Sequence, residues 1–347
     1  MTKNLLVRSF AALTIALATT PLAAQEKQNL KVVGTWGYLN TWTKVEKPFW
    51  TEEIAAASGG AITVEALPMT ELGLKGFEVM RMLQLGVFDA AHGIISYLGD
   101  DPVAEGGDLA GVVQTWEEAK AAASAYEPIL AISFDKTYDA KLLGVYPFPS
   151  QLLYCNSPIE SLADLKGKKI RSYSKSMSDL FTGLGATPVT IAFGEVVPAL
   201  QLGTVDCAVS GTLPSYTSGW GAATTHMVRL STGYAFSFVA LSKVSWDRMD
   251  EKSRKIITTN VGSMIDRAWE VGERDDAMGV ACLTSGPCEV GNPAGLVDVQ
   301  LSEEDRSMLK DVLQTTVLET FGERCGTDCA TAWNDTIGAA VGITISR

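Results

Sequence analysis

Hydrophobic and polar positions alternate along this chain in a pattern that predicts strands and helices in turn. The segment LKVVGTW (30–36) predicts a strand, the segment 45–58 a helix, and AITVEAL (61–67) a second strand. Helical periodicity in GFEVMRMLQLG ends at Gly86, and VFDAAHGI (87–94) then follows as a buried strand. Strands that alternate with helices are typical of an α/β fold with a largely parallel sheet.

The second half of the chain repeats this order of elements. VVPALQLG (196–203) predicts a helix that ends at its glycine, and TVDCAVSG (204–211) predicts the next strand. The strings LQLGVFDAA (83–91) and LQLGTVDCA (200–208) share a helix end, a glycine and an aspartate at one spacing. Ordinary helix-to-strand turns would explain the glycines alone, whereas the whole shared string favours two similar α/β lobes.

Longer helices and two crossovers complete the predicted order. Residues 250–281 have helical spacing and an acidic start, which suits the helix dipole. Ser302 and Asp305 resemble a capping box at the start of a further helix. The chain is expected to cross between lobes near 144–154, where two prolines stiffen it, and again near 210–216.

Residues 1–24 are predicted to lie outside the fold. They begin with basic residues, continue with an apolar run over 10–18, and end in small residues at Ala24. This order is typical of a secretory signal peptide cleaved near Ala24, and its apolar run is shorter than the roughly 20 residues that span a bilayer. The mature chain is therefore predicted to be exported, and its length of about 320 residues predicts two domains or lobes.

The charge of the chain excludes some partners. The formal net charge is −12, and it becomes −14 once Lys3 and Arg8 are removed with the signal peptide. An acidic surface of this kind disfavours binding to nucleic acid or to anionic membranes.

Cysteine usage predicts disulfides. Six cysteines in an exported chain allow 15 pairings. The spacing favours local bridges and leaves one long-range pair, namely Cys282–Cys288, Cys325–Cys329 and Cys155–Cys207. A structural zinc site needs two closely spaced ligand pairs, and only the pair at 325 and 329 has such a spacing. We therefore predict no metal site.

Signals of catalysis are almost absent from the sequence. It contains no G-x-S-x-G, G-x-G-x-x-G, G-x-x-x-x-G-K or H-E-x-x-H motif. A catalytic histidine would have to be His92 or His226, and His92 lies on a buried strand among small and apolar residues, where a core role is more typical. The carboxylate pairs at 100–101 and 275–276 have the pattern of solvated charges. No catalytic residue and no cofactor is predicted.

Arg171 stands out in this acidic chain. It follows Ile170 directly, at the point where a strand after Gly167 should enter the core. A guanidinium group matches a carboxylate bidentately, and a buried charge without a partner is very costly. Spacing alone leaves three alternatives, namely an internal ion pair with Asp or Glu, a surface position beside Lys168 and Lys169, and a bound carboxylate.

Two strings around this arginine resemble a known family. IESLADLKGKKIRSYS (159–174) and GATPVTIAFGEVVPALQLGTVDC (185–207) are similar to the signature of the DctP-like substrate-binding proteins of TRAP (tripartite ATP-independent periplasmic) transporters. The resemblance extends to ELGLKGFEVMRMLQLGVFDAA (71–91) and to the long helix after Met249, and so covers nearly the whole mature chain.

The resemblance implies an α/β, two-lobed periplasmic-binding-protein (Venus-flytrap) fold with a long helix that spans the lobes. We expect residues 25–148 and 212–248 to form lobe 1, and residues 149–211 and 249–347 to form lobe 2. Such a protein binds a small organic acid in the periplasm and delivers it to TRAP integral membrane subunits, which use an ion gradient. Two alternatives are a binding protein of an ATP-driven importer or sensor kinase, and a secreted enzyme on a similar scaffold.

The resemblance also implies ligand-binding residues. Arg171 would clamp the ligand carboxylate, Phe193 would pack over the ligand, and Ser210 would line the hinge side. Sialic-acid-binding members have asparagine at the position of Ser210, some members have a second arginine at that of Gln151, and others have a carboxylate at that of Ile94. These departures favour a monocarboxylate with an apolar or aromatic body over a polyhydroxylated sugar acid.

Aromatic residues are the remaining candidates for the pocket. Trp36 and Tyr38 lie in the loop that follows the first strand, and Tyr97 is expected at the inner rim. Trp220 and Phe236 could join them, although Phe236 could equally fill the strand between the lobes.

Overall fold

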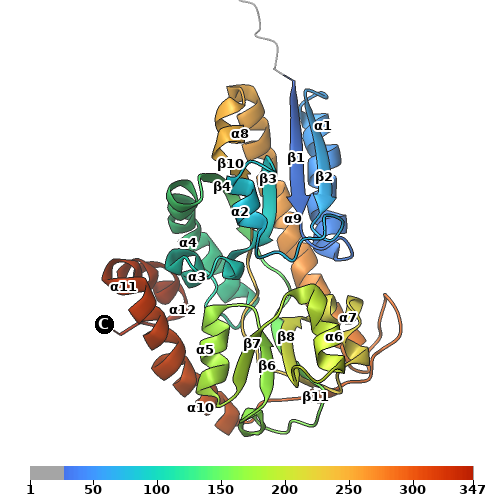
Figure 1. Cartoon of the computed structure of the whole chain (residues 1–347), viewed down its shortest axis with the longest axis vertical. Coiled ribbons are helices and arrows are strands. Elements are labelled where there is room, and N and C mark those ends of the chain that lie inside the picture. Colours follow the sequence, from blue (N-terminus) through green and yellow to red (C-terminus); the bar gives the residue numbers. More distant parts are fainter. Residues whose placement is uncertain (1–26, 347) are drawn as a thin grey trace, which may run out of the picture.

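The computed structural model describes residues 27–346, and the predicted signal peptide with its cleavage point near Ala24 lies outside them. These residues form two lobes, each with its own sheet (Figure 1). Lobe 1 has the sheet order β2-β1-β3-β10-β4, and lobe 2 has the order β11-β9-β5-β8-β6-β7. The α/β class and the two-lobed architecture predicted from the sequence are confirmed.

The strands of the lobe 1 sheet are β1 (Gln28–Gly34), β2 (Ile62–Pro68), β3 (Ala90–Ile94), β4 (Ala140–Tyr146) and β10 (Ser237–Ser242). Those of the lobe 2 sheet are β5 (Gln151–Cys155), β6 (Lys169–Ser172), β7 (Thr187–Thr190), β8 (Cys207–Gly211), β9 (His226–Val228) and β11 (Val297–Val299).

Helices of lobe 1 are the short segments η1 (Thr41–Glu46), η2 (Phe49–Glu53) and η3 (Ile95–Tyr97), with α1 (Ile54–Ala57), α2 (Val79–Gln84), α3 (Pro102–Gly106), α4 (Trp116–Thr137) and α8 (Lys243–Arg248). Lobe 2 has η4 (Leu162–Leu165), α5 (Lys175–Gly183), η5 (Phe193–Glu195), α6 (Val196–Gln201), α7 (Thr212–Thr217) and η6 (Trp220–Ala222).

Both sheets are mixed, which corrects the prediction of a largely parallel sheet. Strand β10 runs antiparallel to both β3 and β4, and β5 runs antiparallel to both β8 and β9. The remaining pairs are parallel. The reason is the path of the chain, because β5 and β10 directly follow the two crossings between lobes and enter each sheet in the opposite direction. The second crossing lies between β9 and β10, so its prediction near 210–216 is wrong.

The shared string LQLG…D marks the same turn in both lobes. Gly86 and Gly203 follow α2 and α6 with φ of 71° and 67°, a left-handed conformation that suits glycine. In lobe 1 the Asp89 backbone N–H donates to the Lys31 carbonyl, and its carboxylate accepts from the Lys31 N–H, both at 2.8 Å. Asp206 and Lys169 make the same two bonds at 2.8 Å in lobe 2.

One long helix runs through both lobes (Figure 1). Helix α9 (Glu251–Leu283) has 33 residues and matches the prediction for 250–281 within two residues. Near its C-terminal end it packs closely on α7, because a Cβ at Gly279 would lie 2.1 Å from the backbone nitrogen of Leu213. The helix is therefore held firmly to lobe 2 at this point.

The C-terminal helices begin with a capping box, as predicted. Asp305 N–H donates to Ser302 Oγ, and Ser302 N–H donates to Asp305 Oδ2. These helices are α10 (Glu303–Val312), η7 (Leu313–Leu318), α11 (Glu319–Trp333), η8 (Asn334–Gly338) and α12 (Ala339–Val341). Segment η7 packs on α5 of lobe 2, whereas α11 and α12 pack on α3 and α4 of lobe 1. The C-terminal helices thus contact both lobes (Figure 1).

Three disulfides are present, and they are the three pairs that the spacing favoured. They join Cys155 to Cys207, Cys282 to Cys288, and Cys325 to Cys329. The first pair lies directly opposite in the register of β5 and β8. Within residues 27–346 no cluster of three or more His, Cys, Asp or Glu side chains could hold a metal ion.

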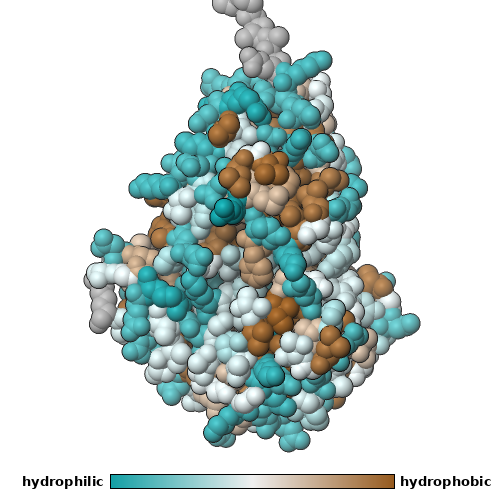
Figure 2. Space-filling model, in the orientation of Figure 1, coloured by the Kyte–Doolittle hydropathy of each residue, from teal (hydrophilic) through white to brown (hydrophobic). Residues whose placement is uncertain are grey.

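One face of the described surface is mostly hydrophilic. Figure 2 shows polar side chains over much of one face, with separate apolar patches near its middle. Among residues 27–346 there is no helix long and apolar enough to cross a membrane.

His92 is a hydrogen-bonded core residue, as predicted. Trp50 Nε1–H donates to His92 Nε2 at 2.6 Å, and His92 Nδ1 lies 2.7 Å from the Tyr146 hydroxyl. That hydroxyl donates to Glu46 Oε1 at 2.8 Å, and the Thr35 N–H donates to Glu46 Oε2 at 2.7 Å. Burial raises the pKa of Glu46 to about 7 and lowers the pKa of His92 to about 3. This network anchors the chain directly before Trp36.

Candidate ligand-binding site

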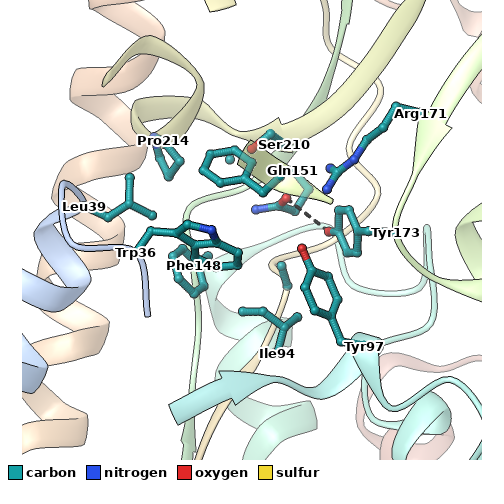
Figure 3. Close-up of a pocket in the computed structure, with 13 residues that line it drawn as sticks. Trp36, Leu39, Ile94, Tyr97, Phe148, Gln151, Arg171, Tyr173, Ser210 and Pro214 are labelled. Carbon is teal, nitrogen blue, oxygen red and sulfur yellow. Dashed lines mark hydrogen bonds between the residues drawn. The ribbon is translucent and has the colours of Figure 1, made fainter. Parts of the chain in front are cut away.

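A cavity lies between the two lobes, at the end where β1, β3, β6 and β8 point toward each other. It contains about 360 Å³ of empty space, part of it open to solvent. Its lining residues come from both lobes and from the crossing segments (Figure 3): Trp36, Leu39, Ile94, Tyr97, Phe148, Gln151, Arg171, Tyr173, Phe193, Ser210, Gly211, Pro214 and Ala235. Arg171 is the only charged side chain among them.

Arg171 is buried in this cavity, with only 1% of the residue exposed. Its Nε donates to the Ile191 carbonyl at 2.8 Å, and its Nη1 donates to the Val209 carbonyl at 2.6 Å. Its Nη2 has no hydrogen-bond partner, and no carboxylate within residues 27–346 forms an ion pair with it. The surface position and the internal ion pair considered from the sequence are therefore both wrong.

Two tyrosines lie beside the guanidinium group. The Arg171 Cζ atom is 4.8 Å from the centroid of the Tyr173 ring, which is a cation–π arrangement. Tyr97 packs against Tyr173 with ring centroids 5.9 Å apart. Burial raises the pKa of Tyr97, and the charge of Arg171 partly opposes that effect. Both hydroxyls thus stay protonated and can donate hydrogen bonds.

Gln151 and Ser210 supply further polar groups, from adjacent strands. Gln151 Nε2 donates to the Pro149 carbonyl at 2.7 Å, and its Oε1 accepts from the Tyr173 hydroxyl at 3.1 Å. Ser210 faces Leu152 across the register of β5 and β8, and its side chain makes no hydrogen bond to another described residue. The polar groups of the cavity are gathered around Arg171 (Figure 3).

Aromatic side chains form the opposite wall, and they join the lobes. Trp36, which follows β1 in lobe 1, contacts Phe193 of lobe 2 edge-to-face with centroids 5.2 Å apart. It also contacts Phe148 at 6.2 Å and Tyr97 at 6.4 Å. The cavity therefore has one strongly basic pole and one apolar wall, an arrangement suited to an anion with an apolar body.

Comparison with known proteins decides the family. Residues 32–321 match the family model of DctP, the bacterial extracellular solute-binding protein, family 7. The chain belongs to this family.

Individual relatives agree with this membership. The C4-dicarboxylate-binding periplasmic protein DctP of Rhodobacter capsulatus is 24% identical over 286 residues, which are 81% of this chain and 83% of that protein. A Bordetella pertussis extracytoplasmic solute receptor binding pyroglutamic acid has a TM-score of 0.80 at 23% identity, over 90% of this chain and 99% of that one.

A second solved structure shows the same fold. A TRAP periplasmic solute-binding protein from Desulfovibrio salexigens, with bound orotic acid, has a TM-score of 0.79 at 18% identity, over 91% of this chain and 100% of that one. At this level of identity the likeness concerns the fold, which is that of TRAP solute-binding proteins.

Three residues predicted for the pocket of this DctP-family chain do not line the cavity. Tyr38 is 46% exposed and stacks on Phe193, with centroids 6.5 Å apart. Trp220 is fully buried and contacts Phe193 at 5.9 Å, so it lies behind that ring. Phe236 packs in the core near Trp269. The other six predicted residues, Arg171, Phe193, Ser210, Gln151, Trp36 and Tyr97, line it.

Several lining residues were missed from the sequence. Tyr173 lies two positions after Arg171, and the period of two along a strand could have placed both on one face. Phe148 lies between the two prolines of the first crossing. Leu39, Pro214 and Ala235 carry no chemical signal, because apolar residues of this kind are equally common in a core.

Ion pairs join the two lobes at the rim of the cavity. Lys75 of lobe 1 lies 2.5 Å from Glu195 of lobe 2, and Lys175 of lobe 2 lies 3.0 Å from Asp100 of lobe 1. Both pairs are largely exposed. Exposed pairs are screened by salt, so they guide closure more than they hold it.

Lys75→Ala is expected to weaken solute binding by no more than about fivefold at low salt. The difference from wild type should disappear near 1 M salt, where the screening length is about 3 Å. Titration calorimetry at two salt concentrations measures this, with Lys310→Ala on α10 as an exposed control. If the loss of affinity persisted at high salt, the Lys75–Glu195 pair would contribute more to solute binding than an exposed, salt-screened ion pair can.

Proposed function

We propose that this protein is a periplasmic receptor that binds a small organic acid through Arg171 and delivers it to ion-gradient-driven TRAP membrane subunits. Export by the predicted signal peptide belongs to the same proposal. So do the predicted lobe boundaries, with the change that residues 212–228 lie in lobe 2 and the chain returns to lobe 1 between β9 and β10. One observation carries it. Arg171 is fully buried and faces the cavity, and within residues 27–346 it has no carboxylate partner and one guanidinium nitrogen without a hydrogen bond.

Physical chemistry gives this observation its weight. Burying a charge is costly unless hydrogen bonds and an opposite charge compensate for it. Two backbone carbonyls satisfy part of the guanidinium group, but they bring no negative charge. A bound carboxylate would supply both the charge and the acceptor for Nη2. Closure of the lobes removes water from this contact and thereby strengthens it.

The lining favours a monocarboxylate with an apolar or aromatic body. A single cation balances a single carboxylate, and Gln151, Ser210 and the Tyr97 hydroxyl supply a few oriented hydrogen bonds. Trp36 and Phe193 would cover the apolar part of the ligand. The cavity is small, which favours a small ligand. Two structural relatives bind small cyclic acids, pyroglutamic and orotic acid, whereas others bind the sugar acids glucuronate and galactonate. All of these ligands are acids, and the apolar body proposed here is supported by the lining residues.

A second layer of aromatic residues lies behind the apolar wall. Tyr38, Trp220 and Phe236 would act on the ligand indirectly, by supporting Phe193 or the adjoining core. None of the three lines the cavity, which favours this supporting role over a direct contact with the ligand.

Matched acids and carboxamides test the proposed ligand class. Pyroglutamate, orotate and benzoate, each with its carboxamide, would be screened by thermal shift and then measured by calorimetry. At least one acid should raise the melting temperature by mass action, and its carboxamide should not. If no acid shifts the melting temperature, or if only neutral sugars or cations do so, the proposal is wrong.

A further inference from the structure

We propose that Tyr173 is a positioning residue that holds Arg171 and Gln151 together as one preformed, donor-only binding unit for a carboxylate. The inference rests on the proposed function and adds the element that decides its selectivity for an acid over the matching amide. It follows from two contacts of Tyr173, a residue that is 6% exposed, and from the close approach of Gly211 to Gln151.

The first contact holds the charged guanidinium group of Arg171 in position. Tyr173 presents its ring to the guanidinium group, with 4.8 Å between Cζ and the ring centroid. Arg171 is also bonded to two backbone carbonyls, so its position is set from three sides. The nitrogen that remains without a partner, Nη2, is therefore presented in one direction.

The second contact fixes the orientation of the amide. The Tyr173 hydroxyl donates to Gln151 Oε1 at 3.1 Å, while Nε2 of the same amide donates to the Pro149 carbonyl at 2.7 Å. In Figure 3 the carbonyl of Gln151 points toward Tyr173 and its nitrogen points away. An amide nitrogen carries two hydrogens, so one N–H donor is left over.

The space for this amide depends on a glycine. A Cβ built at Gly211 would lie 3.0 Å from Gln151 Nε2 and 3.4 Å from the Pro149 carbonyl oxygen. A Cβ at this position, which would also lie 3.2 Å from Pro214 Cγ, would therefore displace the amide by a few tenths of an ångström. Gly211 offers a way to displace Gln151 without altering Tyr173.

These contacts make the polar pole of the cavity a set of donors. Arg171 Nη2 and the second N–H of the Gln151 amide are both donors without an acceptor among the described residues. The Gln151 carbonyl is turned toward Tyr173. A carboxylate offers acceptors only, whereas a carboxamide also brings N–H groups. Arg171 and Gln151 offer these N–H groups no acceptor, and only the hydroxyl oxygens of Ser210 and Tyr97 remain for them. The Tyr173 hydroxyl thus supports affinity and, in addition, rejection of the amide.

Tyr173→Phe tests the inference, because it keeps the ring and removes the hydroxyl. The probe is the acid among pyroglutamate, orotate and benzoate that binds wild type most tightly, measured with its carboxamide by calorimetry. We expect the acid to bind about two- to tenfold more weakly, the effect of one neutral hydrogen bond. The preference for acid over carboxamide should fall as well, because the freed Gln151 carbonyl can turn toward the cavity. A purely structural role would weaken both compounds equally.

Matched variants complete the test. Tyr154→Phe removes a buried hydroxyl of the same lobe that has no hydrogen-bond partner among residues 27–346, and this variant should bind the acid as wild type does. In the Gln151→Ala background, Tyr173→Phe should have almost no further effect on affinity or preference. Gly211→Ala should lower the acid preference as Tyr173→Phe does, and it serves as the second variant if Tyr173→Phe folds poorly.

The outcomes separate this inference from the proposed function. If Arg171→Met loses the acid but Tyr173→Phe and Gly211→Ala keep wild-type affinity and preference, the role of Tyr173 is wrong and the receptor function stands. Additive effects of Tyr173→Phe and Gln151→Ala would also overturn it. If Arg171→Met binds the acid normally, the proposed function itself fails.

Discussion

Arg171→Met should weaken binding of the best acid probe by about 30-fold or more, while the ligand-free protein stays at least as stable as wild type. Removing one partner of a desolvated charge pair costs about 2–5 kcal/mol of binding free energy, which gives this factor. Methionine has a similar length and no charge. It therefore leaves the cavity filled but removes the group that pairs with the carboxylate.

The stability half of this expectation follows from the absence of a carboxylate near Arg171 in residues 27–346. Replacing a buried charge by an apolar side chain of similar volume is often neutral or stabilising. An arginine with a purely structural ion pair would show the reverse pattern, with lower stability and no direct effect on binding.

Arg229→Ala is a matched control, because Arg229 has its own partner in Asp298 at 2.7 Å and does not line the cavity. Calorimetry with the acid probe measures the affinity, and chemical denaturation without the probe measures the stability of the ligand-free protein. Normal affinity in Arg171→Met would remove the basis of the proposed function.

Glu46→Gln should change how stability depends on pH, by about 3 kcal/mol between pH 4.5 and 7. In the folded protein burial raises the pKa of Glu46 from its ordinary 4.5 to about 7. The folded state therefore binds more protons than the unfolded chain in this window, and the contribution of Glu46 to the free energy of unfolding falls as pH rises through it. Glutamine has no such titration and removes this slope.

His92 acts in the opposite direction. Its pKa is lowered from 6.5 to about 3 by burial, so the unfolded chain binds more protons between these values. The contribution of His92 to stability is present above pH 6.5 and is lost as pH falls toward 3. In wild type the two contributions nearly cancel between pH 4.5 and 6.5. In Glu46→Gln only the contribution of His92 remains. The free energy of unfolding of this variant, relative to wild type, should therefore rise with pH between pH 4.5 and 6.5.

Urea denaturation at a series of pH values and constant ionic strength would measure the difference between the two curves. Glu52→Gln, an exposed position on η2, is the control and should follow wild type. Parallel curves for Glu46→Gln and wild type would contradict the account of a buried, protonated Glu46.

Much of the local structure could be predicted from the sequence, because its causes are local. The strand at β6, the turn at Gly167 and the capping box at Ser302 each depend on residues within a few positions. The shared turn of Asp89 and Asp206 is equally local, since each aspartate bonds to the start of the neighbouring strand. Glycines with positive φ and hydrophobic periodicity carry such information in short windows.

The candidate site was predicted only in part, for a related reason. Chemistry and family resemblance singled out Arg171, but Trp220 and Phe236 have the same composition signal as Trp36 and Phe193 and lie in the core instead. An aromatic residue buries its ring equally well in a core or in a pocket wall. Its side of the sheet depends on packing that a linear pattern does not contain.

By itself, the sequence determined the α/β elements, the helix-to-strand turn that both lobes share, the disulfide pairs and an arginine directed inward. Each of these depends on residue type and spacing. Only the tertiary structure decided that no carboxylate meets Arg171 within residues 27–346, that the sheets are mixed, and that Tyr173 links Arg171 to Gln151. These facts depend on segments far apart in the chain. Whether a buried charge has a partner can be seen only once all the side chains around it have been placed.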